Sequence, residues 1–311
     1  MRVNAREAVI VHEGHLNLAT WEITSADGVT VTVWSNQARI KSGPEALTVM
    51  ACAGLGTPPE AWPTLLAQPE RYRIYGAYYR GTQGAPIPHG AIPTVEDHVS
   101  DIIALMDAEH IERAVFVGWS FGVNIACDAA LEHPDRVQAV LGVAGTPGDT
   151  FAGLLGSAPI PKAIKRRIGM LGSRAASASG RVVDVMARRT PIGATGWVMR
   201  HTGFVMPGVS IAYLNALLDF LLTHDFTWYF ALAHGAGAHS RLELSAIKQP
   251  VTLIAGKWDI LTGAREIKAC AAELPDCEYL ELKGSHFLPA EYAEECEQAL
   301  DALARRAGIA T

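Results

Sequence analysis

The sequence predicts an α/β protein with a mostly parallel, doubly wound sheet and a helical insertion. Three observations favour this fold class. Short apolar runs that suit strands buried on both faces alternate with helical patterns. One of these runs ends in a Gly-x-Ser-x-Gly pattern at residues 118–122, and only helical patterns occur between residues 148 and 240. We therefore expect a core formed by residues 1–147 and 241–311, with residues 148–240 inserted as a helical cap.

The composition excludes several classes of protein. The 311 residues are 49% hydrophobic and 19% charged, with a net charge of −6, so a basic nucleic-acid-binding face is not expected. The five cysteines are scattered without a Cys-x-x-Cys pair, which suits reduced thiols in a cytoplasmic protein. Residues 1–8 lack the apolar stretch of a signal peptide, and no apolar run could span a bilayer. No membrane partner is expected, and the oligomeric state is not predicted.

The elements follow from periodicity and turn signals. Residues 16–24 and 29–34 alternate around a Ser-Ala-Asp-Gly turn, which predicts an antiparallel hairpin at the edge of the sheet. Buried strands are expected at residues 46–51, 72–78, 114–118, 137–143, 250–256 and 277–282. Helices are expected at residues 94–106, 122–132, 264–274 and 290–306, and in the insertion at 161–171, 181–189, 196–204 and 210–222.

Ser120 lies in a stretch that passes from strand to sharp turn to helix. A side chain at Gly118 or Gly122 would crowd the neighbouring strand and helix, so both glycines serve a steric purpose. The turn lifts the serine hydroxyl above the sheet and leaves the backbone N–H of Phe121 free at the start of the helix. A nucleophile beside a donor for a developing oxyanion suits acyl transfer. The alternative is a glycine-bounded turn with an incidental serine.

The loop at residues 52–59 follows a buried strand and is rich in glycine. Gly54 and Gly56 lack the third glycine of a dinucleotide fingerprint, and two prolines remove N–H donors, so no nucleotide cofactor is expected. We interpret the loop as one that brings the backbone N–H of Leu55 toward Ser120. A plain strand-to-helix turn is the alternative.

Asp259 and His286 follow the last two predicted strands. Because the carboxyl ends of parallel strands meet at one edge of a sheet, both should approach Ser120. His286 would act as the base, and Asp259 would orient its imidazole. Asp149 and Asp225 are rival acids.

Other side chains could form a metal site, a docking site or the substrate pocket. The histidine pairs lack a third ligand at standard spacing, so surface histidines and no metal are expected for His12 with His15 and for His234 with His239. A basic cluster is interpreted as a solvated helix face, or alternatively as a docking site for a phosphopantetheine carrier: Lys162, Lys165, Arg166 and Arg167. The substrate pocket is expected to include Trp119, Leu154, Trp258 and Phe287.

These motifs resemble those of the α/β-hydrolase fold superfamily, in particular of small bacterial serine esterases with a helical cap. The segments that carry the resemblance are 53–56, 80–81, 118–122, 257–259 and 284–286. The resemblance implies a catalytic triad of Ser120, Asp259 and His286. It also implies an oxyanion hole formed by the N–H groups of Leu55 and Phe121, without a cofactor.

Two positions depart from the family pattern. Ala53 stands where many members have histidine, and Tyr78-Tyr79 stands where an aspartate commonly precedes Arg-Gly. The hydrogen bonds that shape the loop at residues 53–56 must therefore differ from those in most members.

The expected function is hydrolysis of a carboxylic ester with a largely apolar acyl group, through an acyl-enzyme on Ser120. Three alternatives stay open at this stage. The same residues suit a thioesterase or acyltransferase that uses CoA or a carrier protein, and they suit a carbon–carbon bond hydrolase. A ligand-binding module with an inactive triad is the non-enzymatic alternative.

Overall fold

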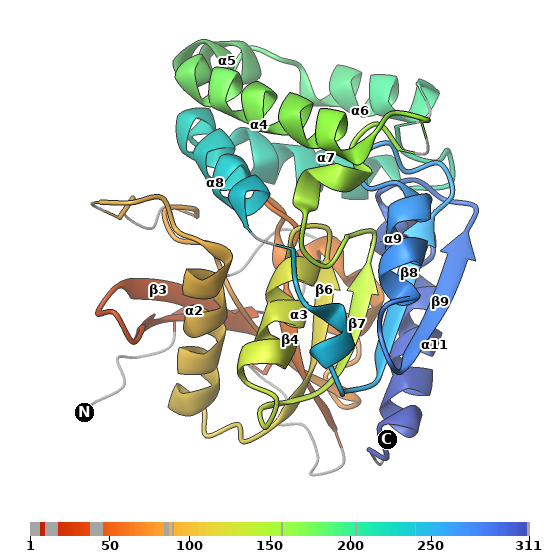
Figure 1. The fold of residues 1–311 in the computed structure, drawn as a ribbon. Coiled ribbons are helices and arrows are strands. Elements are labelled where there is room, and N and C mark those ends of the chain that lie inside the picture. Colours follow the sequence, from red (N-terminus) through yellow and green to blue (C-terminus); the bar gives the residue numbers. More distant parts are fainter. Residues whose placement is uncertain are drawn as a thin grey trace.

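The computed structural model describes residues 7–9, 18–37, 46–83, 87–88, 90–156, 158–202, 204–239 and 241–309. Within them, nine strands form one sheet in the order β1-β2-β3-β5-β4-β6-β7-β8-β9 (Figure 1). The strands are β1 (Glu7–Val9), β2 (Leu18–Thr24), β3 (Thr30–Ser35), β4 (Leu47–Cys52), β5 (Tyr72–Ala77), β6 (Ala114–Trp119), β7 (Val137–Val143), β8 (Val251–Gly256) and β9 (Cys277–Leu282). Strands β4 to β9 are parallel and β1 to β3 form an antiparallel edge, which confirms the predicted fold class.

Helices cover both faces of this sheet. The helices of the core are α1 (Pro63–Leu66), α2 (Val95–Ala108), α3 (Gly122–Glu132), α9 (Ala264–Ala271), α10 (Leu288–Glu291) and α11 (Ala293–Arg306). Side chains of α2, α3 and α9 pack on one face, and those of α1 and α11 pack on the other. Strand β6 shows why: Phe116 belongs to the first cluster, its neighbours Val115 and Val117 belong to the second, and all three are buried. The near-continuous apolar run at residues 114–118 therefore reflects two buried faces.

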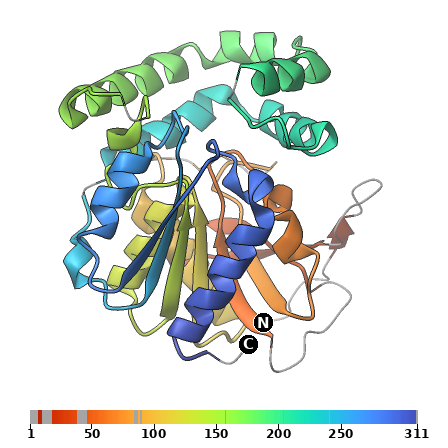
Figure 2. The same ribbon diagram turned by 90° about the vertical axis from the view of Figure 1, so that its right-hand side faces the viewer.

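Five helices lie between β7 and β8 in the chain. They are α4 (Lys162–Ala178), α5 (Gly180–Ala187), α6 (Ile192–His201), α7 (Ile211–Leu222) and α8 (Phe226–Ala238). Figures 1 and 2 show them as a layer above the end of the sheet where β6 and β8 terminate. Among the described helices, none combines the length and apolar character needed to cross a membrane.

Among the elements missed in the sequence are α1, α8 and β1. Helix α1 has only four residues, too few to show a helical period. Helix α8 has apolar residues on all sides, so it lacks the one-sided stripe that identifies a helix. Strand β1 has only three residues, too few to show a period, and it exists through its pairing with β2. The hairpin prediction is confirmed for residues 18–24 and 30–34, while residues 16 and 17 lie outside the described part of the chain.

Candidate active site

The turn after β6 holds Ser120 in a strained conformation with a φ of +55°. Its backbone N–H donates to the carbonyl of Val143 at 2.9 Å. A Cβ on Gly122 would lie 1.9 Å from the carbonyl oxygen of Cys52, and one on Gly118 would lie 2.5 Å from that of Gly122. No such contact is tolerated, so the steric interpretation of the two glycines is confirmed. Strain of this kind at a non-glycine residue is typical of functional sites.

Three side chains meet above the carboxyl ends of β6, β8 and β9. The Nε2 atom of His286 lies 2.9 Å from the Oγ of Ser120. The Nδ1 atom of the same imidazole lies 2.8 Å from the Oδ2 of Asp259. Both distances are those of hydrogen bonds, so the imidazole links the serine hydroxyl to the carboxylate.

Asp259 is buried and accepts several hydrogen bonds. Its Oδ1 accepts from the backbone N–H groups of Leu261 and Thr262 at 2.7 and 2.8 Å, and its Oδ2 accepts from the hydroxyl of Thr262 at 2.6 Å. Burial acts to raise the pKa of Asp259, but the charge and hydrogen bond of His286 and the bonds from Thr262 outweigh it. The net pKa is lowered, which favours the carboxylate. The sequence analysis did not single out Thr262. The bond from Leu261, two residues after Asp259, is that of an Asx turn, and Thr262 is the next residue in this turn.

The two rival acids have other partners. Asp149 lies 3.6 Å from the guanidinium of Arg166. Asp225 caps α8 and accepts from the backbone N–H of Trp228 at 3.0 Å. Neither carboxylate pairs with His286, so the geometry favours Asp259.

Two backbone N–H groups beside Ser120 have no acceptor within the described residues: those of Leu55 and Phe121. The turn that contains Leu55 is closed by Thr57, whose N–H and hydroxyl both donate to the carbonyl of Gly54, at 3.2 and 2.8 Å. Gly56 has a φ of +71° in this turn, a conformation that suits glycine. These two free amides are the donors that an oxyanion would require.

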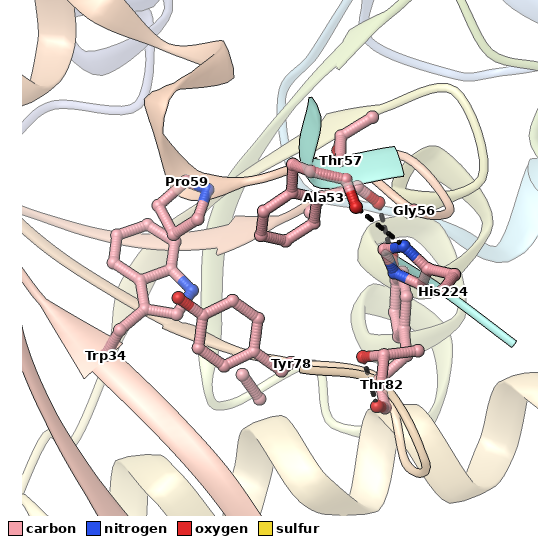
Figure 3. A pocket seen from close by; sticks show the side chains of 11 residues that line it. Trp34, Ala53, Gly56, Thr57, Pro59, Tyr78, Thr82 and His224 are labelled. Atoms are coloured by element: carbon pink, nitrogen blue, oxygen red, sulfur yellow. Dashed lines mark hydrogen bonds between the residues drawn. The ribbon is translucent and has the colours of Figure 1, made fainter. Parts of the chain in front are cut away.

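Tyr79 supports the loop from behind. Its hydroxyl donates to the carbonyl of Ala53, and its ring lies 5.2 Å from that of Phe121. Burial raises the pKa of Tyr79 well above its usual value, so the phenol stays protonated as a donor. Figure 3 shows the void behind this loop, which measures only about 10 Å³. Tyr79 thus contacts the loop at Ala53, where many members of the resembled family have a histidine.

A cavity of about 510 Å³, here called the larger chamber, adjoins Ser120 and His286. Its walls are mainly apolar side chains from α6, α7 and the loops above the sheet. Trp119 and Phe287 line it, and the indole N–H of Trp119 donates to the carbonyl of His286 at 2.9 Å. Trp258 is not among its described lining residues and is 46% exposed, so the expectation that it lines the pocket is not met. The backbone N–H of Trp258 is bonded to the carbonyl of Gly284, and its side chain lies toward solvent.

A second cavity of about 160 Å³, the smaller chamber, lies on another side of the same serine. Leu154 lines it, together with residues of α3 and α8. Four residues line both chambers: Leu55, Ser120, Tyr229 and Leu261. Ser120 therefore stands at the boundary between a larger and a smaller space.

The basic cluster lies on a solvated helix face at three of its four positions, since Lys162, Arg166 and Arg167 are exposed and only Lys165 departs from the expectation. Lys165 is buried, and its ammonium donates to the carbonyl of Gly156 at 2.7 Å. Lys162 pairs with Glu266 of the core, and Arg166 lies near Asp149. Lys165 is therefore not accessible to a partner, and two of the three exposed cations lie near carboxylates of this protein, so the alternative of a docking site for a carrier gains no support here.

One group of described residues has the composition of a metal site. Glu96, Asp128 and His239 each offer a ligand atom, and these atoms all lie within 4.8 Å of one another. His239 is buried, which corrects its interpretation as a surface histidine; His234 is partly buried and lies 3.2 Å from the hydroxyl of Ser173. His12 and His15 lie outside the described residues. None of the three grouped residues lines the chambers at Ser120.

Comparison with known proteins identifies the family. The family model for the alpha/beta hydrolase fold matches residues 48–163. A putative carbamate hydrolase RutD from Caulobacter sp. (strain K31) is 36% identical over 246 residues, which cover 74% of this chain and 79% of that protein. The chain therefore belongs to the α/β-hydrolase family. Two other curated relatives are matched over only 39% and 54% of their own lengths.

Solved structures agree on the fold. The esterase EaEST from Exiguobacterium antarcticum superimposes with a TM-score of 0.70 at 15% identity, covering 91% of this chain and 98% of that one. The enol-lactonase from Burkholderia xenovorans LB400 gives a TM-score of 0.66 at 21% identity, covering 91% and 99% of the two chains.

Proposed function

We propose that this protein is a serine hydrolase that cleaves a carboxylic ester with a largely apolar acyl group. The observation that carries the proposal is the hydrogen-bonded line from Ser120 through His286 to Asp259. Two free backbone amides beside the serine and an apolar chamber of about 510 Å³ support it further. Helices α4 to α8, within residues 148–240, would serve as the cap that encloses the acyl group.

The proposed reaction begins when the Oγ of Ser120 attacks the ester carbonyl carbon and His286 takes the hydroxyl proton at Nε2. The carbonyl oxygen becomes an oxyanion and accepts hydrogen bonds from the N–H groups of Leu55 and Phe121. The C–O bond then breaks as His286 returns its proton to the leaving alcohol. Water attacks the acyl-enzyme by the same sequence and releases the acid. The low pKa of Asp259 keeps its carboxylate opposite the transient imidazolium.

The first test is the mass of the intact protein after treatment with a small fluorophosphonate. We expect one adduct on the wild type and none on Ser120→Ala, because only an activated serine attacks this reagent. A panel of esters that differ in acyl length would then show the apolar preference. Absence of an adduct, together with ester hydrolysis that persists in Ser120→Ala, would falsify the proposal.

Carbamate hydrolysis is a second candidate. It is motivated by the relative from Caulobacter, a putative carbamate hydrolase. The same nucleophile and oxyanion donors would serve a carbamate carbonyl. An ethyl carbamate and an ethyl ester with matched apolar groups, compared by kcat/KM, would separate the two candidates.

A further inference from the structure

Helices α4, α5 and α6 present large apolar side chains to solvent. Of the fourteen large apolar side chains that are exposed among the described residues, eight lie on these three helices. None of the eight lines either chamber, so they form no part of the walls around Ser120. Exposed apolar side chains that gather in one region mark a surface that another molecule covers.

The exposed apolar side chains of α4 lie along one face of the helix. Ile164, Ile168 and Leu171 follow one another at spacings of four and three residues and are 44–59% exposed. The helix packs on the protein through a different face, where a Cβ on Gly169 would lie 2.3 Å from the ring of Phe151. Helix α4 therefore has one face for the protein and another that is free.

Helix α5 repeats this arrangement. Val182, Val185 and Met186 share one face and are 49–65% exposed. The opposite face packs on α8, since a Cβ on Gly180 would lie 2.3 Å from the backbone of that helix. Figure 1 shows α4, α5 and α6 on the side of the helical layer that is away from the sheet, and α6 adds the exposed Trp197. The exposed side chains of residues 162–201 are here called the outer face.

The charge of this stretch is opposite to that of the rest of the protein. Residues 162–201 contain nine of the 26 lysines and arginines but one of the 32 acidic residues, which gives a net charge of +8. The remainder of the chain has seventeen basic and thirty-one acidic residues and carries −14. Five arginines of the stretch are exposed and form no ion pair among the described residues: Arg167, Arg174, Arg181, Arg188 and Arg189. Their charges are available to an anionic partner.

We propose that the outer face docks on the surface of an anionic lipid bilayer. A bilayer offers both of the required chemistries in one surface, because anionic headgroups lie directly above hydrocarbon. The apolar side chains would enter the hydrocarbon boundary, where tryptophan is favoured, and the arginines would pair with phosphates. A second copy would instead bring the arginines of one face against those of the other. Docking on a surface needs no spanning run, and the sequence excluded only a spanning run.

Sedimentation with lipid vesicles tests the role of charge. The wild type should sediment with vesicles of equal parts phosphatidylglycerol and phosphatidylcholine and should stay in solution with phosphatidylcholine alone. The double variant Arg167→Gln/Arg174→Gln should bind about 25-fold more weakly, since each cation near such a surface contributes about fivefold. The matched control, Arg113→Gln/Lys248→Gln, makes the same charge change just before β6 and β8, at the end of the sheet away from the layer. It should keep the wild-type affinity within about twofold.

The apolar contribution needs a variant without a change in charge. Leu171→Gln/Met186→Gln should weaken vesicle binding by about tenfold or more, because two side chains lose their transfer into hydrocarbon. Ile87→Gln, at an exposed isoleucine outside the layer, is the control and should bind like the wild type. Ser120→Ala should also bind like the wild type, because docking does not depend on the proposed function.

Several results would overturn the proposal. One is the absence of sedimentation with the anionic vesicles, and another is an equal loss in the arginine variant and its control. Binding that survives Leu171→Gln/Met186→Gln would show that charge alone suffices, as it would for any polyanion. A dimer in sedimentation velocity that the same variant dissociates would assign the outer face to a second copy. If a double variant does not fold, Arg174→Gln and Leu171→Gln decide the question singly.

Discussion

The sheet and the helical layer α4–α8 differ in how they bury apolar side chains. Large residues of the sheet, such as Phe116 and Leu141, are completely buried. In the helical layer Leu171, Met186 and Trp197 are 58–65% exposed, although α6, α7 and α8 of the same layer line the larger chamber. The sheet is thus packed from both faces, whereas the layer contacts the core along one side.

Specific contacts join the two regions. The indole N–H of Trp228 donates to the carbonyl of Arg80 at 2.8 Å, and Lys162 pairs with Glu266. A Cβ on Gly56 would lie 2.6 Å from the ring of Tyr229, so α8 sits directly against the loop that carries Leu55. Under the proposed function, the edge of the sheet would position the reacting groups and the helical layer would shape the space for the substrate.

The largest expected effect is on kcat, and it comes from a substitution at the edge of the sheet. Asp259→Asn should lower kcat for ester hydrolysis by about 10⁴-fold, because an amide cannot hold the imidazole in the required tautomer. Asp149→Asn, which changes the rival acid, should leave kcat within about twofold. Steady-state kinetics on both variants would check this. An equal loss in the two variants would contradict the assignment of Asp259.

The next largest difference between the sheet and the helical layer is expected in the free energy of unfolding. Phe116→Ala removes a completely buried ring from the sheet and should reduce the free energy of unfolding by about 3–5 kcal/mol. Leu171→Ala, in the helical layer and 59% exposed, should change it by no more than about 0.5 kcal/mol. Urea denaturation measures both. A large loss in Leu171→Ala would show that this face of the layer is covered in solution.

A smaller effect on kcat is expected at the loop of residues 53–57. Tyr79→Phe removes the hydroxyl that donates to Ala53 and should lower kcat by about tenfold, the equivalent of one hydrogen bond, with little change in KM. Tyr78→Phe is the matched control and should retain the wild-type kcat. Identical kinetics for Tyr79→Phe and the wild type would remove the positioning role of Tyr79.

The smallest expected effect is on the pH dependence of stability. It concerns Asp128 of α3, which lies beside His239 at the end of the helical layer. Burial, reinforced by Glu96 and Glu132 and opposed by His239, raises the pKa of Asp128 to about 6. The folded protein then binds this proton more tightly than the unfolded chain does. Stability is therefore lost as pH rises from about 4, the unfolded value, to about 6. Asp128→Asn removes this loss.

Thermal melting at two pH values would check this last prediction. The Tm of Asp128→Asn should exceed that of the wild type by about 2 °C at pH 8, and the two should converge near pH 4. A difference that instead grows on acidification would mean that Asp128 is stabilised as a carboxylate, most directly by the imidazolium of His239.

Much of the core could be predicted because its signals are local. Each buried strand is a short apolar run, and the turn at residues 118–122 requires glycine at two positions for steric reasons visible in the motif. The polar residues that follow the strands could then be placed at one edge of the sheet, since parallel strands end together. Asp259 and His286 could be identified in this way from the sequence.

What the sequence determined by itself was the six parallel strands, the antiparallel hairpin, the strand-turn-helix at Ser120 and the groups that follow β8 and β9. The tertiary structure decided which polar residues lose contact with water. Lys165 and His239 look like surface residues in the sequence but are buried, Trp258 looks like a pocket residue but is exposed, and Asn124 and Thr146 carry no signal at all. Burial of a side chain depends on contacts between residues far apart in the chain, whereas strand patterns and tight turns arise from neighbours in sequence.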